Sequence, residues 1–148
     1  MGKNYRQSCI LLLSVLLVSF LSGCSAKGPA FTKIDHLAAD KGLVYIYRVP
    51  AFTGSAVYYD IKVNGNPITT LKNGGYFPYQ TLTGEIEFSA ATETSSSVTL
   101  DVEPGKEYYI KGSLSVGFLA GRPHLAVVPN KVGEKEIQEC VLLPETTK

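Results

Sequence analysis

The strongest constraint on the fold is a series of short stretches, spaced about ten residues apart, in which apolar and polar side chains alternate. Residues 85–91, for example, place Ile86, Phe88 and Ala90 on one face and polar side chains on the other. Further strands are expected at residues 58–63, 68–71, 98–103, 106–113 and 125–128. We therefore predict an all-β fold, a single antiparallel Ig-like or transthyretin-like sandwich of about seven to eight strands.

Three local signals add detail to this prediction. Asn64-Gly65 supplies two residues that tolerate positive φ, which predicts a type I′ hairpin. Residues 43–47 are apolar on both faces and therefore indicate a central strand. Pro78 cannot donate a hydrogen bond to a neighbouring strand, so residues 76–79 are expected to form a short edge strand.

The N-terminus has the charge and length pattern of an export signal. Lys3 and Arg6 precede an apolar run at residues 10–20, which is shorter than the roughly 20 residues of a membrane-spanning helix. The motif Leu21-Ser22-Gly23-Cys24 follows and resembles the lipobox of bacterial lipoproteins. This resemblance implies cleavage just before Cys24 and a diacylglyceryl lipid on its thiol. The alternative is an ordinary secretory signal that ends in Gly-Cys.

The lipobox also bears on location and domain organisation. Ser25, rather than Asp, follows the cysteine, which by resemblance to the enterobacterial sorting rule favours the outer membrane, on its periplasmic face, if the host is Gram-negative. Residues 133–143 fit either a short helix or a final strand. The predicted organisation is a cleaved signal-peptide helix at 1–23, a lipidated flexible tether and lead-in at 24–41, the β-sandwich at 42–143 and a loose tail at 144–148.

The charge balance limits the partners of the mature chain. The sequence has 14 basic and 13 acidic side chains, and loss of Lys3 and Arg6 with the signal leaves 12 basic ones. Such a nearly neutral domain has no basic field to attract nucleic acid or anionic lipid. We therefore expect no nucleic-acid partner, and attachment to the membrane through the lipid on Cys24 alone.

The cysteines exclude an internal disulfide in the mature protein. Cys9 leaves with the signal and Cys24 is lipidated, so Cys140 remains alone. It lies among apolar residues and is expected to be a buried small hydrophobe. A reactive thiol or an intermolecular bridge is the alternative.

No recognisable catalytic or metal-binding set occurs in the sequence. His36 and His124 are far apart and belong to no zinc-binding motif. Glu85 and Glu87 share one strand face, where a solvated surface is the ordinary interpretation. We therefore expect a protein that is not an enzyme and that has no metal or cofactor.

The candidate binding residues are outward-facing tyrosines and two loops. Alternation turns Tyr58 and Tyr109 outward, and an aromatic ring with a polar tip suits a sugar or a protein surface. The loops at residues 48–55 and 117–123 each offer a phenylalanine and an arginine for docking. In the alternative interpretation, both phenylalanines are tucked under their loops. The candidates are Arg48, Phe52, Tyr58, Tyr109, Phe118 and Arg122.

The order of these motifs resembles one known family. Residues 42–48, 63–65, 71–77 and 102–109 look like the DUF2846 family of small bacterial lipoproteins and exported proteins, and the resemblance covers most of residues 42–130. The central stretch also resembles PEGA-type surface domains. The family supports the fold, but it has no established catalytic residues to carry over.

We expect a lipid-anchored cell-envelope protein whose non-catalytic sandwich binds a protein or glycan partner. One alternative is an accessory enzyme, or a hydrolase-associated factor, acting on cell-wall polysaccharide. Another is a structural subunit of an envelope assembly. The oligomeric state is left open by the sequence.

Overall fold

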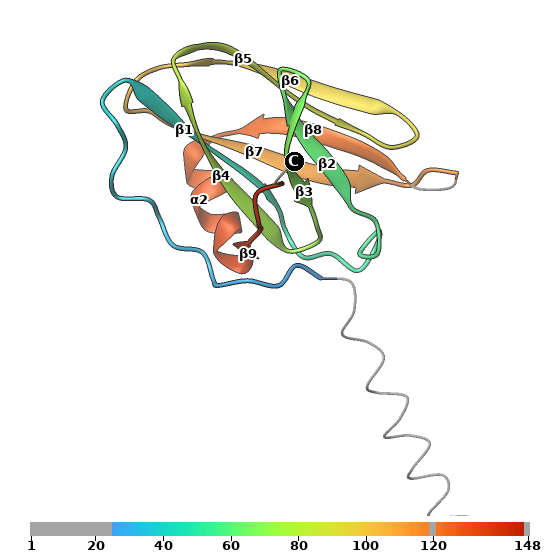
Figure 1. Ribbon diagram of the computed structural model, residues 1–148. Coiled ribbons are helices and arrows are strands. Elements are labelled where there is room, and N and C mark those ends of the chain that lie inside the picture. Colours follow the sequence, from blue (N-terminus) through green and yellow to red (C-terminus); the bar gives the residue numbers. More distant parts are fainter. Residues whose placement is uncertain (1–24, 119–120, 147–148) are drawn as a thin grey trace, which may run out of the picture.

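The computed structural model describes residues 25–118 and 121–146, which fold into two β-sheets packed face to face (Figure 1). The predicted signal peptide and Cys24 lie outside the described residues. A short helix, α2 (Asn130–Glu136), and a 3-10 turn, η1 (Ile137–Glu139), complete the fold. The strands are β1 Lys41–Arg48, β2 Tyr59–Val63, β3 Asn66–Leu71, β4 Gly75–Leu82, β5 Gly84–Ala91, β6 Ser95–Val102, β7 Glu107–Ser115, β8 Arg122–Val128 and β9 Val141–Leu142.

The larger sheet has five strands in the order β8-β7-β1-β4-β9. The predicted central strand is confirmed, because β1 lies between β4 and β7. It runs antiparallel to β4 and parallel to β7, with Tyr45 opposite Pro78 on one side and Tyr109 on the other. The smaller sheet has four antiparallel strands in the order β3-β2-β5-β6.

The predicted all-β sandwich is confirmed, with three differences in detail. The described residues form nine strands rather than seven or eight. Two strand pairs, β1 with β7 and β4 with β9, are parallel. Pro78 belongs to an eight-residue strand, β4, that is not the last of its sheet. It is tolerated because β9 pairs only with Gly75 and Tyr76, so Pro78 has a strand neighbour only on the β1 side.

The turn and core patterns follow the sequence closely. Asn64 and Gly65 both have positive φ, at 46° and 82°, as a type I′ hairpin requires. The alternating apolar residues of both sheets meet between them and exclude water from the main core. Its fully buried members include Val44, Ile46, Ile61, Leu71, Phe88 and Ile110.

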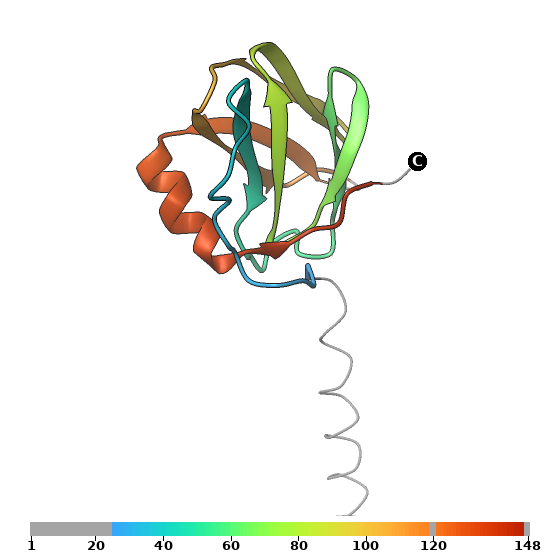
Figure 2. The ribbon, with the colours of Figure 1, turned by 60° about the vertical axis from the view of Figure 1, so that its left-hand side comes forward.

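A second apolar cluster covers the outer face of the larger sheet. Figure 2 shows α2 and the lead-in chain lying over this face. Tyr45, Tyr47 and Tyr109 belong to this cluster, separate from the sandwich core, and are fully buried. Burying this outer face explains why β1 is apolar on both faces. Residues 130–142 thus form a helix, a 3-10 turn and a short strand in succession, so both alternatives predicted for this stretch occur.

The lead-in chain lies along the domain, which corrects the expectation of a flexible tether. The rings of Phe31 and Tyr76 meet edge to face, with centroids 5.1 Å apart. Pro29 accepts a 2.8 Å hydrogen bond from the backbone N–H of Leu142, and Lys33 forms a 2.9 Å ion pair with Glu107. These contacts tie the described lead-in to the larger sheet.

Candidate functional site

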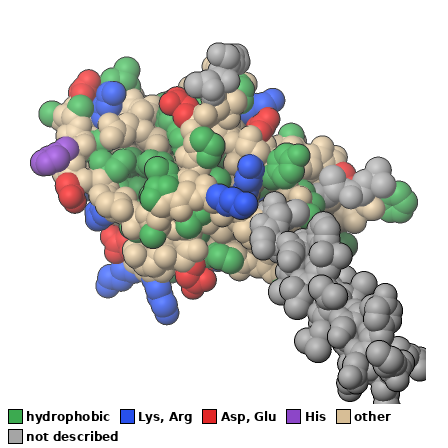
Figure 3. Space-filling model, turned by 60° about the horizontal axis from the view of Figure 1, so that its bottom comes forward, with side chains coloured by type: hydrophobic (Ala, Val, Ile, Leu, Met, Phe, Trp, Pro, Cys, Tyr) green, Lys and Arg blue, Asp and Glu red, His purple; other side chains and the backbone are tan. Residues whose placement is uncertain are grey.

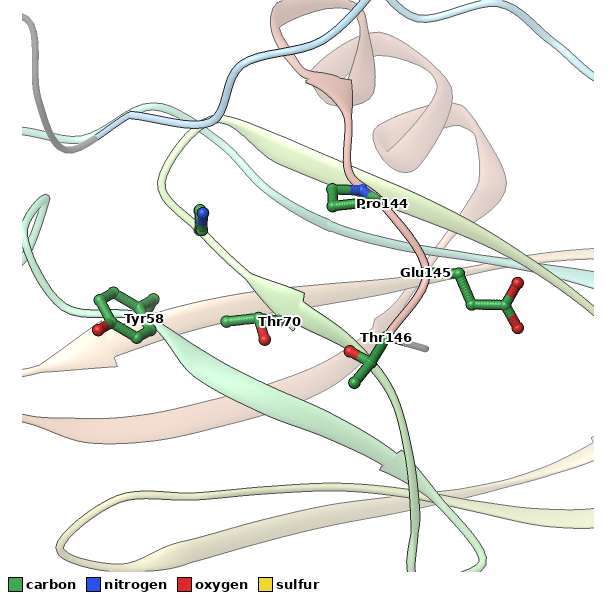
Figure 4. A pocket seen from close by; sticks show the side chains of 6 residues that line it. Tyr58, Thr70, Pro144, Glu145 and Thr146 are labelled. Atoms are coloured by element: carbon green, nitrogen blue, oxygen red, sulfur yellow. The ribbon is translucent and has the colours of Figure 1, made fainter. Parts of the chain in front are cut away.

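The candidate site is a surface hollow of about 360 Å³ beside strand β3. Tyr58 borders it, and this ring is 64% exposed, as the outward prediction for Tyr58 requires. In Figure 4, Thr70 lies between Tyr58 on one side and the C-terminal segment on the other. The residues lining the hollow are Tyr58, Thr70, Lys72, Pro144, Glu145 and Thr146.

The far wall of the hollow is built by the C-terminal segment. The hydroxyl of Thr69 donates a 2.8 Å hydrogen bond to the carbonyl of Pro144, and the N–H of Thr146 donates one of 2.8 Å to Ile68. An isolated bridge joins Thr69 to Glu145. Residues 144–146 are therefore fastened to the outer edge of β3, in contrast to the loose tail that the sequence predicted.

The chemistry of the hollow is mixed. The exposed ring of Tyr58 offers an apolar face, Thr70 a hydroxyl and Lys72 a cation, whereas the carboxylate of Glu145 points away from Tyr58 and Thr70 in Figure 4. The hydroxyl of Thr70 donates a 2.7 Å hydrogen bond to Asp60, which fixes its orientation on the strand. An aromatic face beside hydrogen-bonding groups can bind a sugar ring or a polar peptide, whose own apolar and polar faces it matches.

Arg48 has a structural position instead of the exposed one expected of a docking residue. It is only 3% exposed, and its Nη1 and Nη2 atoms each donate a 2.7 Å hydrogen bond, to the carbonyls of Val57 and Gly54. Its guanidinium also lies 6.0 Å from the ring centre of Tyr59, and burial lowers the pKa of Arg48. The side chain therefore closes its own loop.

Tyr109 requires a similar correction. The alternating pattern correctly predicted that Tyr109 points away from the sandwich core. However, α2 covers this side chain, and only 1% of the residue is exposed. Burial raises the pKa of Tyr109, and its hydroxyl has no hydrogen-bond partner among the described residues. The local sequence could not show this, because residues 133–143 fitted a strand as well as a helix.

The other predicted loop residues are exposed and lie apart from the hollow. Phe52 and Phe118 are 98% and 91% exposed, so neither ring is tucked under its loop. Arg122 is exposed at the start of β8. A smaller hollow of about 150 Å³ lies between the loop after β1 and the end of β7, and Arg48 lines it.

A charged triad joins α2 to the larger sheet. Glu136 accepts a 2.6 Å hydrogen bond from the hydroxyl of Tyr47 and pairs with the ammonium of Lys111 at 2.7 Å. The hydrogen bonds from Lys111 and then from Tyr47 lower the pKa of Glu136, whereas burial raises the pKa of Tyr47. The triad holds α2 in place, and its Lys111 also lines the smaller hollow.

The hollow includes residues that the sequence did not identify. Lys72 belongs to a predicted turn, and Thr70 lies on β3 at the edge of its sheet. Pro144, Glu145 and Thr146 belong to the predicted loose tail. No local pattern marks which tail residues pair with which strand, since that pairing is long-range. The polar character of Glu145 and Thr146 was the only available signal.

The described residues offer neither a metal cluster nor a spanning helix. Within residues 25–118 and 121–146, no three His, Cys, Asp or Glu side chains are grouped to hold a metal ion. In the same part of the chain, no helix has the length and apolar character needed to cross a membrane. His36 and His124 are both exposed, as are Glu85 and Glu87 on β5.

Fold and hollow together define a small all-β sandwich with a polar-aromatic surface site. The sequence model of a family described as "Protein of unknown function (DUF2846)" matches residues 38–122, which is more than half of the chain. The chain therefore belongs to the DUF2846 family. No curated protein and no solved structure shows a significant match to it.

Proposed function

We propose that this protein is a lipid-anchored component of the bacterial cell envelope whose sandwich binds a protein or glycan partner without catalysis. The observation that carries the binding proposal is the hollow beside Tyr58, whose lining combines an exposed aromatic ring with hydrogen-bonding residues. Glu85 and Glu87, the carboxylates of the rival hydrolase hypothesis, line neither hollow. The hollow is thus the better supported site.

The anchor proposal rests on the sequence Leu21-Ser22-Gly23-Cys24 after a short apolar run. Two or more acyl chains on Cys24 would hold the protein almost permanently, since each buried methylene contributes about 0.8 kcal/mol. Ser25 after the cysteine supports an outer-membrane location in a Gram-negative host. The resemblance to PEGA-type surface domains supports display of the sandwich at a surface.

The anchor is tested by fractionating cells that express the wild-type protein or Cys24→Ser. We expect the wild type in the outer-membrane fraction of a density gradient and the variant in the soluble envelope fraction. Persistence of Cys24→Ser in membranes would contradict the anchor.

Binding is tested with purified wild-type protein, Tyr58→Ala and a control, Val127→Ala, incubated with envelope extract and with isolated cell-wall glycan. Val127 is also an exposed apolar residue but lies on β8, away from the hollow. We expect a partner to be retained by the wild type and Val127→Ala and lost by Tyr58→Ala. Failure of the wild type to retain any protein or glycan would refute the binding proposal, as would equal retention by all three.

A further inference from the structure

One end of the sandwich collects four segments that are distant in sequence: residues 25–28, 49–58, 72–75 and 113–118, here called the loop end. The strand register brings them together. β1 and β7 are parallel, with Tyr47 opposite Lys111, so both strands finish at this end. β4 is antiparallel to β1 and begins here, with Gly75 opposite Arg48.

Asn73 ties three of these segments to one another. Ser25 forms an isolated bridge with it, and its carbonyl accepts a 2.9 Å hydrogen bond from the N–H of Ala26. Its side-chain oxygen accepts another of 2.9 Å from the N–H of Ala51. The first described residue, Ser25, is therefore held directly at the loop end.

The loop end also carries the most exposed large apolar side chains of the described residues. Phe52, Val116 and Phe118 are 98%, 82% and 91% exposed. They lie in separate loops, one after β1 and one after β7, and both loops project from the same end. Several large apolar groups presented together on one end of a small domain indicate contact with an apolar phase or partner.

The four segments of the loop end contain only positive charges, although one carboxylate, that of Glu93, lies against the fourth segment. None of its four segments contains Asp or Glu, while Lys27 and Lys72 are exposed. Arg122 is exposed just beyond the fourth segment, and Glu93, from the β5–β6 turn, accepts a 2.9 Å hydrogen bond from the N–H of Phe118. Figure 3 views the molecule from the side where the described chain begins, and hydrophobic, Lys or Arg, and Asp or Glu side chains are interspersed on this face.

We propose that the loop end lies on the lipid bilayer, with Phe52, Val116 and Phe118 in its interfacial region and the lysines at its phosphates. This inference rests on the proposed lipid anchor. Cys24 is bonded directly to Ser25, about 3.8 Å away between Cα atoms, so acyl chains on Cys24 place the bilayer at the loop end. Apolar rings below long cationic side chains are the pattern by which proteins enter a membrane interface.

The test uses tryptophan fluorescence, because the chain contains no tryptophan. Phe52→Trp and Phe118→Trp are each prepared as the mature lipidated protein and inserted into phosphatidylcholine vesicles with or without brominated acyl chains, which quench tryptophan on contact. Leu82→Trp is the matched control, since Leu82 is 61% exposed but lies at the opposite end of β4 from Gly75. Val116→Trp provides a third position at the loop end.

We expect brominated lipid to quench the tryptophan of each of the three loop-end variants several-fold more strongly than that of Leu82→Trp, with all four proteins floating with the vesicles. If all four variants float with the vesicles but are quenched equally, the interfacial contact is overturned, whereas the lipid anchor is still supported. A blue-shifted but unquenched signal at the loop end would also overturn it, because a protein surface would then cover the rings. Failure of the lipidated wild type to float would refute both the anchor and this inference.

Discussion

Gly133 of α2 lies directly against the ring of Tyr109 on β7, with no room for a side chain between them. A Cβ atom added to Gly133 would overlap the Cβ, Cγ and Cδ1 atoms of Tyr109. Tyr109 cannot easily move, because its ring is stacked on Tyr45 with centroids 5.2 Å apart and packs edge to face with Tyr47. Glycine at 133 therefore sets how closely the helix covers the sheet.

Gly133→Ala should destabilise the protein. In an exposed helix, replacing glycine with alanine stabilises by up to about 1 kcal/mol. Here the overlap with Tyr109 should reverse the sign and lower the free energy of unfolding by about 1–3 kcal/mol. Urea unfolding measures the change. Lys135→Ala, at an exposed position of the same helix, should stay within about 0.5 kcal/mol of the wild type. A stabilised Gly133→Ala would show that the contact does not limit the packing.

Glu136→Gln should make the fold less stable at neutral pH. Lys111 and Tyr47 hold the pKa of Glu136 below its ordinary value of 4.5 in the folded state. A lowered folded pKa means that the carboxylate stabilises the fold above pH 4.5 and that this contribution is lost as pH falls through the folded pKa. We expect the free energy of unfolding of Glu136→Gln to be about 1 kcal/mol below that of the wild type at pH 7, and this difference to shrink toward pH 3.

Urea unfolding from pH 7 to pH 3 follows this difference. Glu134→Gln is the control, because Glu134 lies on the same helix and its approach to Lys33 is only 3.9 Å, with both side chains about half exposed. It should change stability little at any pH. A Glu136→Gln deficit that stays constant down to pH 3 would rule out the charge of Glu136 as its source.

Arg48→Lys should loosen the loop between β1 and β2. A lysine ammonium cannot reproduce the two guanidinium donors that bind the carbonyls of Val57 and Gly54. We expect a loss of about 1–3 kcal/mol in stability and faster hydrogen exchange of the Val57 amide, which is bonded to Gly54 at 3.0 Å. The control Arg122→Lys, at an exposed arginine, should change neither the stability nor the hydrogen exchange of the Val57 amide. If hydrogen exchange of the Val57 amide is unaltered in Arg48→Lys, Arg48 does not close this loop.

The Cys140 thiol should be unreactive in the folded protein. It is buried, donates a 3.5 Å hydrogen bond to the carbonyl of Arg48, and burial raises its pKa to about 12. The reactive thiolate is therefore scarce at pH 8. Peptide mass mapping after iodoacetamide treatment should find Cys140 labelled only when urea is present. Rapid labelling of the native protein would instead support the reactive thiol that the sequence left open.

The strands were predictable because burial on one face leaves a period-two pattern in the sequence. Ile86, Phe88 and Ala90 show this, although Ile86 is only partly buried. The alternating pattern predicts on which face of a sheet a side chain lies, but it does not predict which strand is the neighbour. The parallel pairing of Tyr45 with Tyr109 was therefore missed.

The candidate site was predictable only in part, for a related reason. Tyr58 was correctly expected to point outward, because its neighbour Tyr59 belongs to the core. The wall opposite it comes from Pro144–Thr146 through hydrogen bonds to Ile68 and Thr69. Such long-range backbone pairing depends on the assembled edge of β3, which no short stretch of sequence encodes.

The order of the strands along the chain has a consequence for how the domain acquires its structure. β1 is the first strand, yet its neighbours include β7, and β9 beside β4 comes almost at the C-terminus. Leu142 of β9 also binds Pro29 of the lead-in. Contacts between such distant parts form slowly and need nearly the whole chain. A nascent chain therefore lacks one neighbour of its central strand until β7 has been made, and it lacks the strand that binds the lead-in until β9 has been made.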